Sequence, residues 1–190
     1  VGRQNLKFGK GWLVTDMLTP SQYISFDALR LTWNPSSDVV VDAFAAKLTD
    51  RYATEQDGDT DFYGVYGTYT GWAPLTMSAY YYFLRDASHI EDTRLTPIGE
   101  WFEEERGLDD YGATRLHTVG THLFGKSNGF DYELEMAYQF GDANHLGVGF
   151  KPLGGLYGDP DAEYNNWGAE ATLGYTFADV KWAPRPYVMG

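Results

Sequence analysis

Three acidic side chains at alternate positions have the types and spacing that could do chemistry. Asp131, Glu133 and Glu135 recur at every second residue. On an extended strand they would share one face at intervals of roughly 6.5–7 Å, which is within the range of the carboxyl pairs that hydrolyse glycosides. Such a pair also needs an apolar pocket around its acid, and nothing near these residues in the sequence supplies one. We therefore interpret them as part of a polar wall and expect no enzyme activity.

Other residues that could bind a metal ion or a cofactor form no complete motif. Asp57, Asp59 and Asp61 alternate as in some calcium loops, but no downstream glutamate completes the twelve-residue pattern. His117 and His122 would lie on opposite faces of a strand. The chain has no cysteine, which excludes thiolate sites and disulfides, and it carries no phosphate loop, dinucleotide fingerprint or nucleophile elbow. We expect no metal site and no cofactor.

The segment that positions the three acids reads as a strand with two unlike faces. In residues 130–140 the even positions are Phe, Tyr, Leu, Met, Tyr and Phe, and the odd ones are Asp, Glu, Glu, Ala and Gln. In a soluble sheet the aromatic face would form a core. In a transmembrane barrel it would face lipid, and the acids would line a wet lumen. Eleven alternating positions suit a membrane strand of about 9–11 residues better than a soluble strand of about 5–6.

Composition narrows the class of protein. Aromatic residues make up 17% of the chain, glycine occurs 22 times, and the mean hydropathy is -0.41. The sequence has no apolar run of 18 residues, so transmembrane helices are excluded, whereas a barrel needs apolar residues only at alternate positions. The net charge of -13 argues against nucleic acid as a partner. Aromatic girdles and glycine-containing strands are typical of a barrel in the bacterial outer membrane.

The remaining sequence predicts an all-β, antiparallel transmembrane barrel within a single domain, 1–190. The connections between its strands alternate between long and short, as the extracellular loops and periplasmic turns of such barrels do. The facing of 39–48 and of 114–124 stays ambiguous, and 98–106 reads as a short helix inside a long connection. Nine strands are an odd number, so we expect a fragment of a longer barrel. The predicted strands are 1–8, 26–33, 39–48, 61–70, 75–85, 114–124, 130–140, 167–177 and 182–189.

Several motifs, in this order along the chain, resemble the alginate-export family of outer-membrane porins. They are Val-Gly-Arg-Gln-Asn-Leu-Lys-Phe-Gly at 1–9, Ser-Phe-Asp-Ala-Leu-Arg-Leu at 25–31, Asp-Phe-Tyr-Gly-Val-Tyr at 61–66, 130–141 with its Tyr-Gln-Phe-Gly end, and Leu-Gly-Tyr-Thr-Phe at 173–177 followed by Trp-Ala-Pro-Arg. The resemblance implies a barrel of about eighteen strands in the bacterial outer membrane. The best-known member of the family exports an anionic polysaccharide through an arginine-rich lumen, whereas the inward faces here also carry acids.

Two functions follow from this interpretation. The first is a porin for passive passage of small solutes, saccharides or polysaccharides, and the second is a structural barrel whose acidic extracellular loops, above all 86–110, dock other surface proteins. A soluble carbohydrate-binding or hydrolytic β-domain is a third alternative. The bilayer and small solutes or saccharides are the expected partners. The residues expected to line the pore are Arg3, Lys7, Arg30, Asp131, Glu133, Glu135, Gln139 and Glu170.

Overall fold

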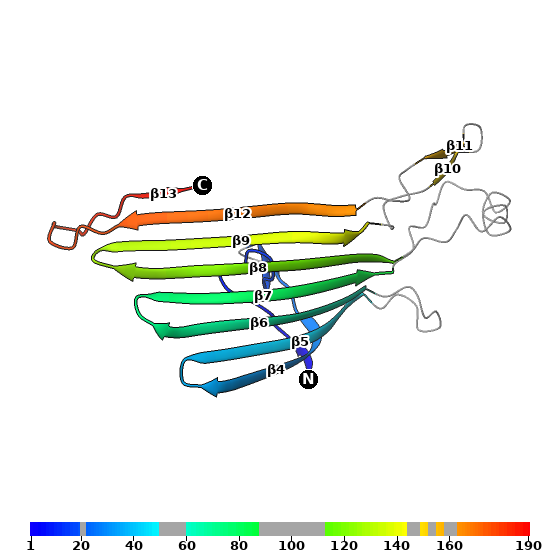
Figure 1. Ribbon diagram of the computed structural model, residues 1–190, viewed down its shortest axis with the longest axis horizontal. Coiled ribbons are helices and arrows are strands. Elements are labelled where there is room, and N and C mark those ends of the chain that lie inside the picture. Colours follow the sequence, from blue (N-terminus) through cyan, green and yellow to red (C-terminus); the bar gives the residue numbers. More distant parts are fainter. Residues whose placement is uncertain (20–21, 50–59, 88–112, 144–148, 152–154, 158–162) are drawn as a thin grey trace.

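One antiparallel sheet dominates the computed structural model, which describes residues 1–19, 22–49, 60–87, 113–143, 149–151, 155–157 and 163–190. Its nine strands follow the order β1-β4-β5-β6-β7-β8-β9-β12-β13, so neighbours in the sheet are neighbours along the chain (Figure 1). Two short hairpins accompany it. The strands are β1 (Gly2–Gln4), β2 (Met17–Thr19), β3 (Gln22–Tyr23), β4 (Phe26–Ser36), β5 (Val39–Thr49), β6 (Thr60–Trp72), β7 (Leu75–Asp86), β8 (Thr114–Ser127), β9 (Phe130–Asp142), β10 (Gly149–Lys151), β11 (Gly155–Tyr157), β12 (Glu163–Tyr175) and β13 (Tyr187–Met189).

The long strands have the length that a membrane crossing requires. They run from 11 residues in β4 to 14 in β8, beyond the usual length of soluble strands. No helix among the described residues is long and apolar enough to cross a membrane. The all-β prediction is confirmed, and the predicted helix at 98–106 lies outside the described residues.

The short connections all lie at one end of the sheet, on the left in Figure 1. Asn128 and Gly129 join β8 to β9 with φ angles of 52° and 84°, and positive φ at both positions is what a two-residue type I′ hairpin turn requires. Similarly short turns join β4 to β5 and β6 to β7. At the opposite end, the strands lead into the longer connections.

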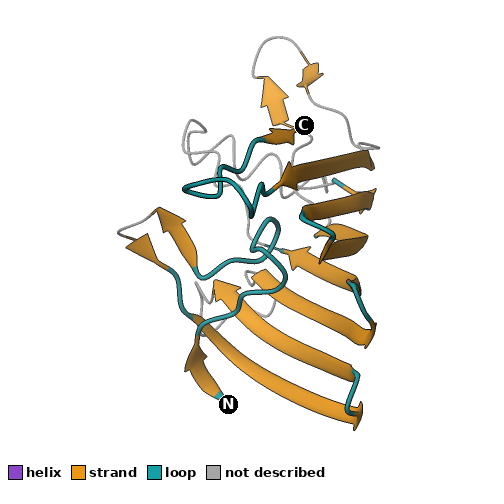
Figure 2. Ribbon diagram, turned by 90° about the vertical axis from the view of Figure 1, so that its left-hand side faces the viewer, coloured by secondary structure: helices purple, strands orange, loops and turns teal. Residues whose placement is uncertain are grey.

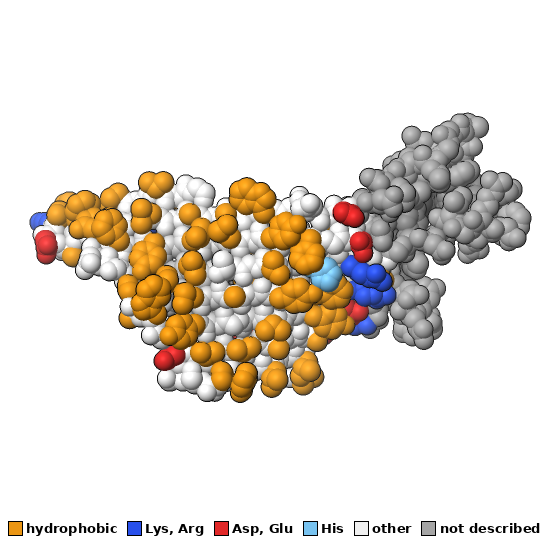
Figure 3. Space-filling model, viewed as in Figure 1, with side chains coloured by type: hydrophobic (Ala, Val, Ile, Leu, Met, Phe, Trp, Pro, Cys, Tyr) orange, Lys and Arg blue, Asp and Glu red, His pale blue; other side chains and the backbone are white. Residues whose placement is uncertain are grey.

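The two faces of the sheet differ in chemistry. The register aligns the apolar alternate positions of neighbouring strands, so they share one face of the sheet. Many of these side chains are exposed, including Leu31 at 66% and Trp167 at 76%. Figure 3 shows this face covered by hydrophobic side chains. The other face carries the polar positions of the same strands. Figure 2 shows that it is the inside of a curve, and we call it the concave face.

The first predicted strand is largely wrong. Only Gly2–Gln4 pairs with the sheet, and residues 5–16, which we call the inner segment, cross the concave face (Figure 2). Gly9 and Gly11 have φ angles of +57° and +86°, a conformation that glycine adopts without strain. The alternation of 1–8 was therefore not that of a membrane strand.

Candidate functional site

The inner segment is held on the concave face by apolar side chains. Leu6 is completely buried, and Phe8 and Val14 are 6% and 4% exposed. The ring of Phe8 stacks on Phe44 and Tyr66, with centroid distances of 5.2 and 5.3 Å. Each buried side chain of this size contributes about 1.5–3 kcal/mol. The inner segment thus has a stable anchor on β5, β6 and β7.

This anchor explains why the facing of 39–48 was ambiguous in the sequence. Asp42 and Phe44 share the concave face of β5 and are 8% and 5% exposed. Phe44 packs against the inner segment, while Asp42 accepts a hydrogen bond of 2.9 Å from Arg30 Nε. A polar face therefore contains an aromatic patch wherever the inner segment covers it.

From the anchor, the inner segment reaches across the concave face to β12. Lys10 Nζ lies 2.7 Å from Glu170 Oε1, with about a fifth and a third of the two side chains exposed. The ring of Trp12 lies over Gly168, where an added Cβ would stand 3.2 Å from its Cη2 atom. The segment thus touches strands on both sides of the concave face.

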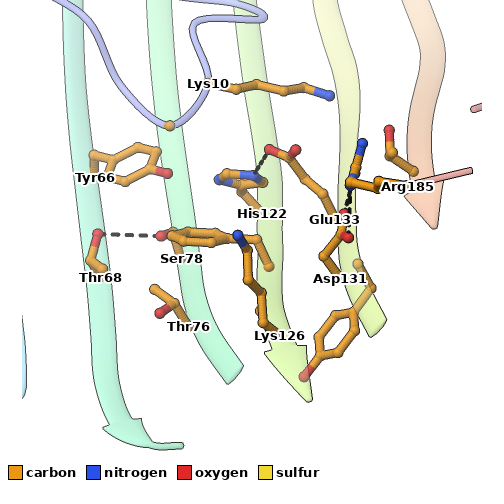
Figure 4. Close-up of a pocket in the computed structure, with 15 residues that line it drawn as sticks. Lys10, Tyr66, Thr68, Thr76, Ser78, His122, Lys126, Asp131, Glu133 and Arg185 are labelled. Atoms are coloured by element: carbon orange, nitrogen blue, oxygen red, sulfur yellow. Dashed lines mark hydrogen bonds and ion pairs between the residues drawn. The ribbon is translucent and has the colours of Figure 1, made fainter. Parts of the chain in front are cut away.

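Between the inner segment and the wall lies an open cavity of about 580 Å³. Figure 4 shows Lys10 extending above it, while Glu133 points toward His122 and Arg185 toward Asp131. The lining combines charges of both signs with hydroxyl groups and aromatic rings. Such a surface offers hydrogen bonds and stacking partners to a polar solute. It is lined by Gly9, Lys10, Tyr66, Thr68, Thr76, Ser78, His122, Phe124, Gly125, Lys126, Asp131, Tyr132, Glu133, Thr172 and Arg185.

Each of the three alternating acids has its own partner. Asp131 accepts hydrogen bonds from Arg185, which lies in the connection after β12, and the bond from Nε is 2.9 Å long. This hydrogen bonding raises the pKa of the Arg185 guanidinium. Glu133 Oε1 lies 2.7 Å from Nε2 of His122. Glu135 is 3% exposed and accepts a 3.2 Å hydrogen bond from Tyr80. Each acid thus has its own hydrogen-bond partner, which suits a polar wall.

Two buried polar atoms beneath the inner segment are left without a partner among the described residues. They are Nδ1 of His122 and Oε2 of Glu135. An added Cβ at Gly9 would stand 3.1 Å from this same His122 atom, so the backbone of the inner segment lies directly over it. An unsatisfied buried group costs about 1–3 kcal/mol. The unsatisfied atoms therefore weaken the binding of the inner segment to the concave face, whereas its buried apolar side chains strengthen it.

The structure brings most of the residues expected to line the pore to the concave face. Arg30, Gln139 and Glu170 lie there with the three acids, and Gln139 Nε2 donates to Thr118 at 3.2 Å. Lys7 is an exposed residue of the inner segment. Arg3 does not join this group. It pairs in register with Asp27, which lies on the apolar face, because the chain leaves the sheet directly after Gln4.

Sequence reasoning missed the basic partners of the acids. Lys10 lies in a stretch interpreted as irregular, His122 in a strand of unclear facing, and Arg185 at the expected start of a strand. The only sign of these partners in the sequence was the presence of basic residues elsewhere in the chain. Assigning a basic residue to each acid required the register of the sheet. No group of three or more potential ligands among the described residues could hold a metal ion, and most of the calcium-like stretch 57–61 lies outside them.

A curved antiparallel sheet with an apolar outer face and a polar concave face is built like the wall of a transmembrane β-barrel, although its end strands β1 and β13 do not pair with each other. The model of the alginate export family matches residues 1–189. The chain therefore belongs to the alginate export family, whose proteins are outer-membrane β-barrels of a transport class that is not known for enzymatic activity. A comparison with curated proteins finds no match.

Proposed function

We propose that this protein is a passive channel for small solutes or saccharides across the outer membrane. The observation that carries the proposal is the concave face, where hydroxyl, amide and paired charged groups surround the cavity under the inner segment. Arg30, Asp131, Glu133, Gln139 and Glu170 line the route. The inner segment narrows the route, and its Lys7 and Lys10 add basic groups there.

The charges on the concave face favour solutes with little net charge. Lys10 and Arg185 pair with acids on β12 and β9, and Glu133 is hydrogen-bonded to His122, so the wall has no continuous cationic track. Long polyanions bind best to arrays of arginine, which pair with carboxylates through two hydrogen bonds. Neutral or weakly charged saccharides fit this mixed surface better.

The test is conductance of the full chain in a planar bilayer, together with swelling of vesicles in neutral and uronic oligosaccharides. We expect steady open currents, weak ion selectivity and faster entry of the neutral sugar. Absence of current at every voltage would contradict the channel. Strong anion selectivity with preferred entry of the uronic oligosaccharide would restore a polyanion as the solute.

We also propose that the short turns face the periplasm and the long connections face outward. The support is that the turns all lie at one end of the sheet (Figure 1). Epitope tags in 88–112 should be reached by antibody on intact cells, and tags at 128–129 should not. The reverse pattern would overturn the topology. The alternative function, docking through 86–110, depends on residues mostly outside the described ranges, and a permanently silent channel would favour it.

A further inference from the structure

A single row of charged side chains crosses the sheet on its apolar face, one from each of eight neighbouring strands. Successive members are direct register partners, from the Arg3–Asp27 pair at one side to Asp142–Glu163 at the other. All stand at the end of the sheet that bears the long connections. The row is Arg3, Asp27, Lys47, Asp61, Arg85, Arg115, Asp142 and Glu163.

The signs alternate along the first five members and then stop alternating. Lys47 and Arg85 lie 3.8 and 3.9 Å from the two oxygens of Asp61, so this acid stands between two basic side chains. Arg115 then stands directly beside Arg85. Like charges at directly opposed positions destabilise a sheet. Among the members of the row, those from Lys47 to Arg115 are three basic side chains and one acidic side chain.

Arg115 is the exposed end of this basic stretch. Within the part of the chain that the structure describes, it makes no ion pair, although Asp142 is its register partner on the other side. Figure 3 shows the basic side chains gathered at one edge of the hydrophobic surface, next to a histidine. The guanidinium groups thus stand where the apolar band ends.

An aromatic ladder borders the row on its membrane side, two residues further along each strand. Tyr63, Phe83, His117 and Phe140 contact one another across β6 to β9, with centroid distances of 6.2, 4.7 and 5.0 Å. Two residues of strand separate ladder and row by roughly 6.5–7 Å. Aromatic girdles mark the interfaces of a barrel with its membrane, so the row lies at the level of the lipid headgroups.

We propose that Arg85 and Arg115 bind the phosphate group of a lipid in the surrounding leaflet, while its acyl chains lie on the aromatic ladder. Arginine holds phosphate through paired hydrogen bonds, and a bound phosphate removes the repulsion between the two side chains. Lys47 is a further basic member of the row, but the proposed phosphate site does not require it. The site lies outside the barrel, so it is independent of the proposed channel.

The test titrates the detergent-solubilised full chain with phosphatidic acid and counts bound lipids by native mass spectrometry. Phosphatidylcholine, whose headgroup has no net charge, is the reference lipid. Arg115→Gln should weaken the tightest phosphatidic acid site about fivefold, as expected for one basic residue near an anionic lipid. Arg115→Lys should bind phosphatidic acid at this site with an affinity between those of the unmodified protein and Arg115→Gln. The side chain is exposed, so the variants should fold, which circular dichroism checks.

Lys181→Gln is the matched control, because it removes one basic group from the short-turn end of the sheet. It should leave the tightest site unchanged. Equal weakening by Arg115→Gln and Lys181→Gln would show attraction to net charge alone and overturn the proposal. Full competition by inorganic phosphate at lipid-like concentrations would also overturn it, since the lipid would then contribute nothing beyond its anion.

Discussion

Replacing Met136 by arginine tests the orientation of the sheet in the membrane. Met136 is 43% exposed on the apolar face and stands midway along the 13 residues of β9. At about 3.4 Å per residue and a tilt of about 40°, β9 spans the roughly 30 Å hydrocarbon core. The side chain of Met136 thus lies near the midplane of the bilayer.

The expected cost follows from that depth. Arginine on the lipid face of a barrel at the midplane costs about 2–4 kcal/mol, a shift of about 30- to 1000-fold in the folding equilibrium. Thr172→Arg is the matched control. Thr172 lines the cavity and is the register partner of Glu133, so its arginine would meet water and an acid. We expect the control to change stability by about 0.5 kcal/mol or less.

The assay is urea-dependent folding of the full chain into lipid vesicles, followed by tryptophan fluorescence. Met136→Arg should lower the midpoint strongly and Thr172→Arg hardly at all. Equal costs for the two variants, or a greater cost for Thr172→Arg, would refute the assignment of the apolar face to lipid.

Three further outcomes concern the concave face. Phe8→Ala should remove about 3–5 kcal/mol of anchoring and raise single-channel conductance while the circular dichroism of the sheet stays unchanged; unchanged conductance would contradict a narrowing role. A double-mutant cycle of Lys10→Gln and Glu170→Gln should give a coupling below about 1 kcal/mol, because both side chains are partly exposed, and a coupling insensitive to salt would be unexpected. Glu133→Gln should move the reversal potential slightly toward anions, more at low salt, where screening is weaker.

The long strands could be predicted because their alternation is local. The predicted 75–85 and 130–140 correspond to Leu75–Asp86 and Phe130–Asp142. Prediction was poorer where polar residues occupy both faces: β12 begins at Glu163, with Asn165 and Asn166 soon after it, and was expected only from 167. No apolar alternation marks that end of the strand.

The concave face was predictable only in part. The alternation of β9 placed its acids on one face, but their partners come from distant segments and could not be inferred without the register. The facing of Arg3 also depends on the pairing of its strand: 1–8 was interpreted as one strand with its polar positions inward, whereas only Gly2–Gln4 pairs with the sheet and Arg3 stands on the apolar face. The same dependence hid the charged row, whose members look unrelated in the sequence.

The inner segment has two parts that are held by different forces, and this predicts which of them moves. Leu6, Phe8 and Val14 are buried among aromatic rings, so displacing them would expose apolar surface to a wet lumen. The tip around Gly9 and Lys10 has fewer buried apolar contacts: it makes a partly exposed ion pair, a contact of the Trp12 ring with Gly168 and a hydrogen bond from Gly11 N–H to the carbonyl of Phe8. It also covers two unsatisfied polar atoms. Opening the tip would let water reach those atoms, which offsets the loss of the ion pair. We therefore expect backbone amides at 9–12 to exchange with solvent faster than those at 6–8, as measured by hydrogen exchange in detergent. Uniform exchange along 5–16 would show that the segment moves as one body, and the tip could then not widen the route without releasing the anchor.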